Sequence, residues 1–182
     1  MLLLAQAALR FNPQAGGAPR PGASWARWDS FSVYGANLHV LCSTNRVPVS
    51  CELTAASAAD VLLVEELLYA ARLRSESARK LLGNLAYRSE SLKKVLAHRS
   101  VVLATERADR RPARRQQVEV CFAALKRVFG LGLPWRRRWW GFATRIAAKM
   151  TAYTYGSTST DFSAGRIDAS RSYGHEILAI LI

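Results

Sequence analysis

The sequence is poor in cysteine and histidine, the residues that build most disulfide frameworks and zinc sites. Its 182 residues include three histidines and three cysteines, and no two cysteines have the C-x-x-C spacing. A sparse and odd number of thiols is typical of proteins in reducing compartments. We therefore expect ordinary core thiols, without a disulfide framework or a structural zinc site.

Long apolar runs are also missing. A membrane-spanning helix needs about 18 or more consecutive apolar residues, and no run in this chain approaches that length. Met1–Leu9 is mostly apolar, but it lacks the basic start and the length of a signal peptide. We expect neither a membrane-spanning segment nor an export signal.

Acidic residues are scarce relative to basic ones. The chain has 13 Asp and Glu against 26 Lys and Arg, which gives a formal net charge of +13. This balance favours a polyanionic partner, with nucleic acid as the first candidate and an anionic membrane surface as the second. Half of the residues are hydrophobic, which indicates a folded core rather than global disorder.

The hydrophobic pattern predicts a domain of alternating strands and helices. Strands are indicated by short β-branched and apolar runs, and helices by apolar residues three and four positions apart. The predicted order is a hairpin of residues 37–43 and 47–53, a helix from about 57 to 73, a strand ending at 83, a helix at 89–98, a strand at 101–105, and helices at 115–129 and 142–155.

The start of the first predicted helix has its own signal. Ser57 with Asp60 three positions later is typical of a capping-box variant, so we expect Ser57 to cap this helix.

Composition marks where the predicted domain begins and ends. Residues 1–34 have no period and are rich in Pro, Gly and Ala, so we expect a poorly ordered segment there. Residues 157–182 form a divergent tail that ends in the apolar run 177–182.

Two polar residues stand at places where a site can form. Asn84 ends the strand in LLGNLAYRS, and Glu119 lies on the helix after the next strand. The apolar stripe of that helix, formed by Val118, Phe122, Leu125 and Phe129, is predicted to face the sheet. A polar residue at a strand end and a carboxylate on a neighbouring helix can converge, so we expect Asn84 and Glu119 to share a small ligand.

This order of elements resembles the catalytic core of DDE insertion-sequence transposases, which have an RNase H-like fold. The resemblance covers roughly residues 35–156, with a break near 133–140. It implies a mixed sheet flanked by helices, and three carboxylates that hold two divalent metals for phosphoryl transfer on DNA. The motifs that carry it are HVLCSTNRVPVSCELTAASAADVLLVEELL, LLGNLAYRSESL, TERADRRPARRQQVEVCFAALKRVFGL and FATRIAAKMTAYTYG.

The sequence departs from the family pattern at two of the three carboxylates. Asn84 stands where the family has its second Asp, and no first Asp lies at the expected distance upstream of the hairpin. Asp29 is too near the hairpin for that role, and Asp60, which matches a family Asp, is explained by capping. Only Glu119 remains, so the Mg²⁺ implied by the family is expected to bind poorly, and the first strand is expected to be missing or replaced.

The family resemblance and the charge balance together imply DNA as partner, in the cytoplasm and associated with the nucleoid. We expect no membrane partner and no small-molecule substrate, and a homo-oligomer remains open. The interpretation is a truncated, degenerate transposase core that has lost its catalytic activity. Two alternatives stay open: a non-catalytic basic nucleic-acid-binding protein, and a metal-dependent nuclease of the same fold.

Basic residues flank the Glu119 helix and are the candidates for DNA contact. The run 107–115 is either a solvated loop or a phosphate-binding loop beside the site, and 133–140 is either a stacking site or a frameshift scar. The predicted nucleic-acid-binding residues are Arg107, Arg110, Arg111, Arg114, Arg115, Lys126, Arg127, Arg136, Arg137 and Arg138.

Overall fold

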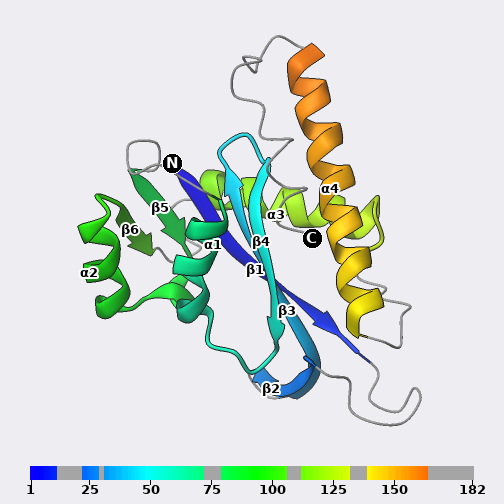
Figure 1. Cartoon of the computed structure of the whole chain (residues 1–182), viewed down its shortest axis with the longest axis horizontal. Coiled ribbons are helices and arrows are strands. Elements are labelled where there is room, and N and C mark those ends of the chain that lie inside the picture. Colours follow the sequence, from blue (N-terminus) through cyan, green and yellow to red (C-terminus); the bar gives the residue numbers. More distant parts are fainter. Residues whose placement is uncertain (12–21, 29–30, 72–78, 106–111, 132–138, 164–182) are drawn as a thin grey trace. The chain divides into compact units, whose positions relative to one another are not determined.

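The computed structural model describes residues 1–11, 22–28, 31–71, 79–105, 112–131 and 139–163. Within these ranges four strands come first, and helices and the last two strands follow, coloured along the sequence in Figure 1. The elements are β1 (Leu2–Arg10), β2 (Ser24–Trp28), β3 (Phe31–Ser43), β4 (Pro48–Ala55), the 3-10 helix η1 (Asp60–Leu63), α1 (Val64–Ala70), β5 (Lys80–Gly83), the 3-10 helix η2 (Leu85–Tyr87), α2 (Glu90–His98), β6 (Val102–Thr105), α3 (Pro112–Arg127) and α4 (Trp139–Ser163).

The six strands form one mixed sheet. Its order is β2-β3-β1-β5-β6, with β4 also paired to β3. Strand β1 is parallel to β5, and β5 is parallel to β6. The N–H of Phe11, just after β1, donates to the carbonyl of Tyr34 near the start of β3 at 2.9 Å, so β3 runs opposite to β1. This mixed sheet flanked by helices is the RNase H-like α/β class that the resemblance implied.

The expectation of a loop or tail in residues 1–34 is wrong for β1 and β2. Strand β1 lies between β3 and β5, and the consecutive residues Leu2, Leu3 and Leu4 are buried, so side chains on both of its faces are covered. A strand of this kind has no apolar–polar alternation, and the sequence LLLAQAALR shows none. Strand β2 is held by five residue pairs with β3, from Ser24–Gly35 to Trp28–Phe31. The place of the first strand is therefore filled by β1, which agrees with replacement rather than loss. Asp29 lies outside the described residues.

The predicted cap at Ser57 is also wrong. The N–H of Ser57 instead donates to Oγ of Ser24 at 2.8 Å, and Oγ of Ser24 donates to Oγ of Ser57 at 2.9 Å. Ala59 precedes η1 without a side-chain cap, and Asp60 is the first residue of that 3-10 turn. Helix α1 follows and ends at Ala70, short of the predicted position. A local capping rule could not foresee that β2 engages the Ser57 hydroxyl.

The other predicted elements are confirmed. Strands β3 and β4 pair across a turn in which Arg46 has a left-handed φ of 67°. Ser89 caps α2, because its Oγ accepts a hydrogen bond from the N–H of Leu92 at 3.2 Å. The last helix, α4, is longer than predicted and continues to Ser163, so the tail expected from residue 157 begins with helix. The apolar run 177–182 lies outside the described residues.

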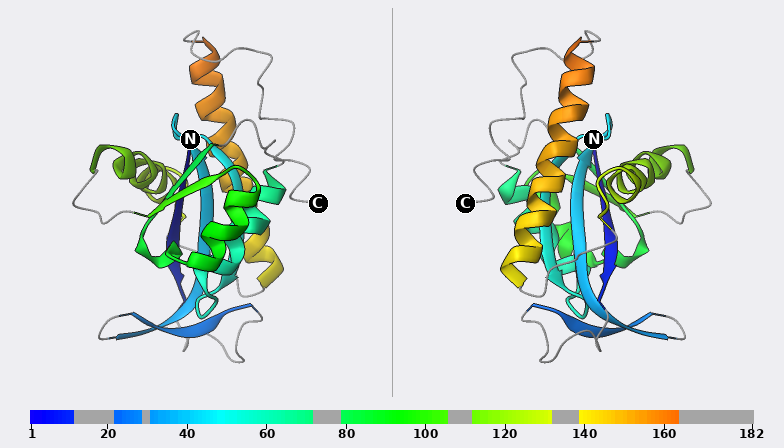
Figure 2. Two further views of the ribbon diagram at one scale, coloured as in Figure 1. Left: turned by 90° about the vertical axis from the view of Figure 1, so that its left-hand side faces the viewer. Right: turned by 90° about the vertical axis from the view of Figure 1, so that its right-hand side faces the viewer.

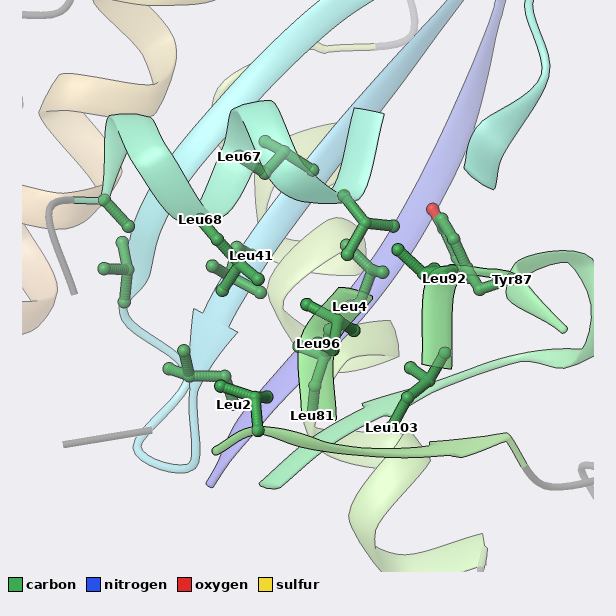
Figure 3. Close-up of a cluster of buried hydrophobic side chains, with 14 residues drawn as sticks. Leu2, Leu4, Leu41, Leu67, Leu68, Leu81, Tyr87, Leu92, Leu96 and Leu103 are labelled. Carbon is green, nitrogen blue, oxygen red and sulfur yellow. The ribbon is translucent and has the colours of Figure 1, made fainter. Parts of the chain in front are cut away.

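The chain divides into two compact units, and β1, β3 and β4 contribute residues to both. The first unit comprises Met1–Ala5, His39–Glu52 and Ala59–Cys121. Its core packs α1 and α2 against the sheet, as the sticks in Figure 3 show. The core residues are Leu2, Leu4, Leu41, Val49, Val64, Leu67, Leu68, Ala71, Leu81, Tyr87, Leu92, Leu96, Val101 and Leu103.

The second unit comprises Gln6–Leu38, Leu53–Ala58 and Phe122–Ile182. In its described part the Phe11 ring packs edge-on against Tyr34 and Phe142, at centroid distances of 6.4 and 4.9 Å. Helix α4 buries Phe142, Ile146 and Met150 on one side. No helix among the described residues is long and apolar enough to span a membrane.

Candidate functional site

Asn84 lies directly after β5, where the sequence analysis predicted it. Its backbone is extended (φ −76°, ψ 179°), and its side chain is half-buried. The side-chain oxygen Oδ1 accepts a hydrogen bond from the N–H of Ala86 at 3.0 Å, and so caps the short helix η2. The amide of Asn84 therefore has a structural partner in the described part of the chain.

Tyr87, three residues further on, is a core residue. It is completely buried, and its hydroxyl is hydrogen-bonded to Nδ1 of His39 on β3 at 3.3 Å. Burial, and then the charge of Asp60, raise the pKa of Tyr87 well above its ordinary value. Burial lowers the pKa of His39 to about 4, so this imidazole is neutral at pH 7. The pair holds β3 against the segment that carries Asn84.

Glu119 lies on α3 and is exposed. The predicted apolar stripe is confirmed for Val118, Phe122 and Leu125, which are buried. The fourth predicted member, Phe129, lies beyond the end of α3 at Arg127 and is half-buried. Cys121 is also buried, with its Sγ 3.9 Å from Sγ of Cys42 on β3, and this contact fixes the α3 segment that carries Glu119 against the sheet. The approach of Glu119 to Asn84 stays a prediction.

The residues present do not fit the two-metal site that the family implies. Three carboxylates are needed to neutralise two divalent ions and to fix their geometry. The nine residues of β1, the central strand, include no Asp or Glu, and the oxygen of Asn84 is engaged as a cap. Within the described ranges, no three or more His, Cys, Asp or Glu side chains gather so that they could hold a metal ion.

The predicted DNA-binding residues are only partly described. Arg107, Arg110, Arg111 and the run 136–138 lie outside the described residues. Arg114 and Arg115 belong to the first turns of α3, and Lys126 and Arg127 are exposed at its end. Lys126 and Arg127 are thus accessible to solvent, and DNA contact by any of the ten residues stays a prediction.

These features define an RNase H-like domain, in which Glu119 is the described residue that matches one of the three acids expected. A sequence profile of the family described as "Transposase DDE domain" matches residues 13–155. The match covers most of the chain, and the chain belongs to this family. A search of curated proteins finds no match.

One solved structure gives independent support for the fold. It is described as "Cryo-EM structure of piggyBac transposase synaptic complex with hairpin DNA (SNHP)". The two chains superpose with a TM-score of 0.52 at 12% sequence identity, over 99% of this chain and 51% of that chain. The chain thus spans about half the length of that transposase. At this identity the likeness shows the fold alone.

Proposed function

We propose that this chain is a transposase core that binds DNA but does not cleave or join it. The observation that carries the proposal is the absence of any acid on β1, together with the capping amide of Asn84 after β5. Two divalent ions at a phosphoryl-transfer site depend on carboxylates for charge and geometry. In the described part of the chain, Glu119 is the one acid assigned to this site.

The alternation of side chains along β5 supports a common face for Asn84 and Glu119. Leu81 belongs to the core under α1 and α2, so Asn84, three positions later, falls on the opposite face of the sheet. Cys42 follows the core residue Leu41 and therefore also faces away from α1 and α2. Its contact with Cys121 supports placing the first half of α3 on that opposite face, which agrees with the two views in Figure 2.

The strand register identifies the position that a first carboxylate would need. Leu2 pairs with Leu81 and Leu3 with Leu82, so two further residues along β1 bring Ala5 level with Asn84. Alternation places Ala5 on the same face as Asn84. Ala5 offers a methyl group where a metal site on this face needs an oxygen ligand. The lack of an oxygen ligand at Ala5 supports a loss of catalysis that has two causes, one at position 5 and one at position 84.

DNA binding is supported by the charge of the chain and by its family. The net charge is +13, and Lys126 and Arg127 are exposed at the end of the Glu119 helix. Cations near a duplex release counterions, so affinity falls with salt by a log–log slope of about 0.9 per neutralised phosphate. Contacts of this kind position DNA without reading its sequence.

The test is a salt series of binding to a fluorescent DNA duplex. The unaltered protein should bind, and its affinity should fall steeply with salt. Replacing Arg110, Arg111, Arg114 and Arg115 with Ala should flatten the slope by about one unit for each phosphate that is no longer neutralised. A control variant removes charge elsewhere, by replacing the exposed cations Arg27, Lys94 and Arg145 with Ala, and should lower the slope by less per charge removed.

Two results would contradict the proposal. One is the absence of any salt-dependent affinity for the duplex. The other is cleavage or joining of the DNA when Mg²⁺ or Mn²⁺ is added. An unchanged salt slope for the Arg-to-Ala variant would mean that these four arginines do not contact DNA. The proposed DNA binding would then depend on other residues.

A further inference from the structure

A second group of basic residues lies at the edge of the sheet opposite to Asn84. Asn84 follows the carboxyl end of β5, whereas Lys80 begins that strand and Arg79 precedes it. Because β1, β5 and β6 are parallel, their amino ends meet at one edge. We call Arg46, Arg79, Lys80 and Arg99 the amino-edge cluster.

The strand register brings the members of this cluster together from distant parts of the chain. Lys80 pairs with Val102 at the start of β6, and the N–H of Val102 donates to the carbonyl of Arg79 at 3.0 Å. Arg99 closes α2 three residues before Val102. All these residues lie in the first unit, together with Arg46.

Arg46 reaches the same edge because β3 runs opposite to β1. The β3–β4 turn that carries Arg46 therefore lies beside the amino end of β1. In Figure 1 this turn, the N-terminus and the start of β5 all lie at the upper end of the sheet. The amino-edge cluster therefore forms a row across the ends of β3, β1, β5 and β6. Its width is about 14 Å at a strand spacing of about 4.8 Å.

The side chains in this row are accessible to a large anionic partner. Arg46, Arg79 and Arg99 are exposed, and Lys80 is half-buried. Arg99 contacts Glu65 at 3.4 Å, but both side chains are about half exposed, at 49% and 46%. An exposed pair of this length contributes little stability. A phosphate can therefore replace Glu65 as the partner of Arg99.

From this arrangement we infer that the amino-edge cluster is a second binding surface for the phosphate backbone of duplex DNA, separate from the Glu119 helix. This inference rests on the proposed DNA binding and adds the place of a second contact. The width of the row is comparable with the major groove of about 12 Å, so its two ends reach phosphates on both rims. Peripheral membrane binding usually adds several apolar side chains that insert between lipids. Beside the four cations, Val102 is the one large apolar residue that is exposed among the described residues at this edge.

The experiment compares two variants of the full chain from which the same amount of charge is removed. The edge variant carries Arg79→Gln, Lys80→Gln and Arg99→Gln. The control variant carries Arg27→Gln, Lys94→Gln and Arg145→Gln, all exposed and outside the cluster. The salt slope of duplex binding should fall by about 2 to 3 in the edge variant, at about 0.9 per phosphate, and by less than about 1 in the control.

A third variant separates charge from folding. Arg79→Lys with Arg99→Lys keeps the cations, so it should retain the slope of the unaltered protein, and melting curves should show all variants folded. Equal slopes for the edge and control variants would overturn the inference. The inference would also be overturned if the edge variant lost binding to phosphatidylserine vesicles but kept the DNA slope of the unaltered protein. The surface would then bind a membrane instead of DNA. If the unaltered protein binds no DNA, the proposed function fails first, and this inference fails with it.

Discussion

The side-chain oxygen of Asn84 accepts a hydrogen bond from the backbone N–H of Ala86, 3.0 Å away. Asn and Asp are about equally good at capping a helix start in this way. The local structure at the end of β5 is therefore compatible with either residue. We therefore expect that a carboxylate at position 84 would change the charge of this site without disturbing the fold.

The first prediction concerns Asn84→Asp. The variant should keep the cap, so its free energy of unfolding should change by less than about 0.5 kcal/mol. It should bind Mn²⁺ or Mg²⁺ more tightly than the unaltered protein, because a carboxylate replaces a neutral amide on the face assigned to Glu119. It should not transfer DNA strands. Calorimetric titration with Mn²⁺ and urea unfolding measure the two effects, and unchanged metal affinity would argue against a shared site.

A second prediction tests the position assigned to the missing first acid. Ala5→Asp combined with Asn84→Asp should bind Mn²⁺ more tightly than Asn84→Asp alone, because three carboxylates would then surround one point. The control is Ala8→Asp with Asn84→Asp, which adds the same charge on the other face of β1. If both double variants bind Mn²⁺ equally, the placement of Ala5 beside Asn84 is wrong.

A third prediction follows from the buried His39. Its pKa in the folded chain is about 4, below the ordinary 6.5, so the unfolded chain binds more protons between these values. The contribution of neutral His39 to the free energy of unfolding is present in full above about pH 6.5 and is lost as the pH drops toward about 4. Between about pH 7.5 and pH 5 the free energy of unfolding should fall by roughly 2 kcal/mol. His39→Gln should reduce this slope in urea unfolding series. An equally steep slope in the variant would assign the effect to other groups.

A fourth prediction concerns the close approach of β3 to β1 in the second unit. A Cβ on Gly35 would overlap the carbonyl oxygen of Leu9 and lie 3.3 Å from Cα of Arg10. Both neighbours are backbone atoms and cannot move aside cheaply, so Gly35→Ala should lower the free energy of unfolding by at least about 2 kcal/mol.

The matched control for Gly35 is Gly156→Ala on α4. Nothing lies within 4 Å of a Cβ at Gly156, so alanine should stabilise this helix by about 0.5–1 kcal/mol. Both variants can be measured by urea unfolding. A mild effect of Gly35→Ala, similar in size to that of the control, would mean that β1 and β3 are not packed as described.

The elements that could be predicted are those specified by nearby residues. Helix α2, the hairpin turn before Val47 and the buried stripe of α3 all depend on spacings within a few positions. Strand β1 could not be predicted, because its central place in the sheet comes from pairing with β3 and β5, which are distant in the sequence. The same holds for Ser57, whose hydroxyl is engaged by Ser24.

The candidate site was predictable in its positions but not in its contacts. The sequence predicted the strand before Asn84 and the helix around Glu119. The hydrogen bond from the N–H of Ala86 to Oδ1 of Asn84 depends on the turn that follows β5 and was not predicted. The amino-edge cluster had no sequence signal, since Arg79 and Arg99 meet only through the pairing of β5 with β6. Pairing between distant strands is set by the whole sheet and not by local composition.

The decisive measurement for a DNA-binding but inactive transposase core is DNA cleavage and strand transfer in Mg²⁺ and Mn²⁺. The unaltered protein and Glu119→Gln are incubated with labelled duplex DNA under conditions in which the unaltered protein binds it. We predict that neither produces nicked or joined DNA above the level without protein. Cleavage by the unaltered protein that Glu119→Gln abolishes would contradict this prediction, because a working metal site would then exist despite Asn84 and the acid-free strand β1.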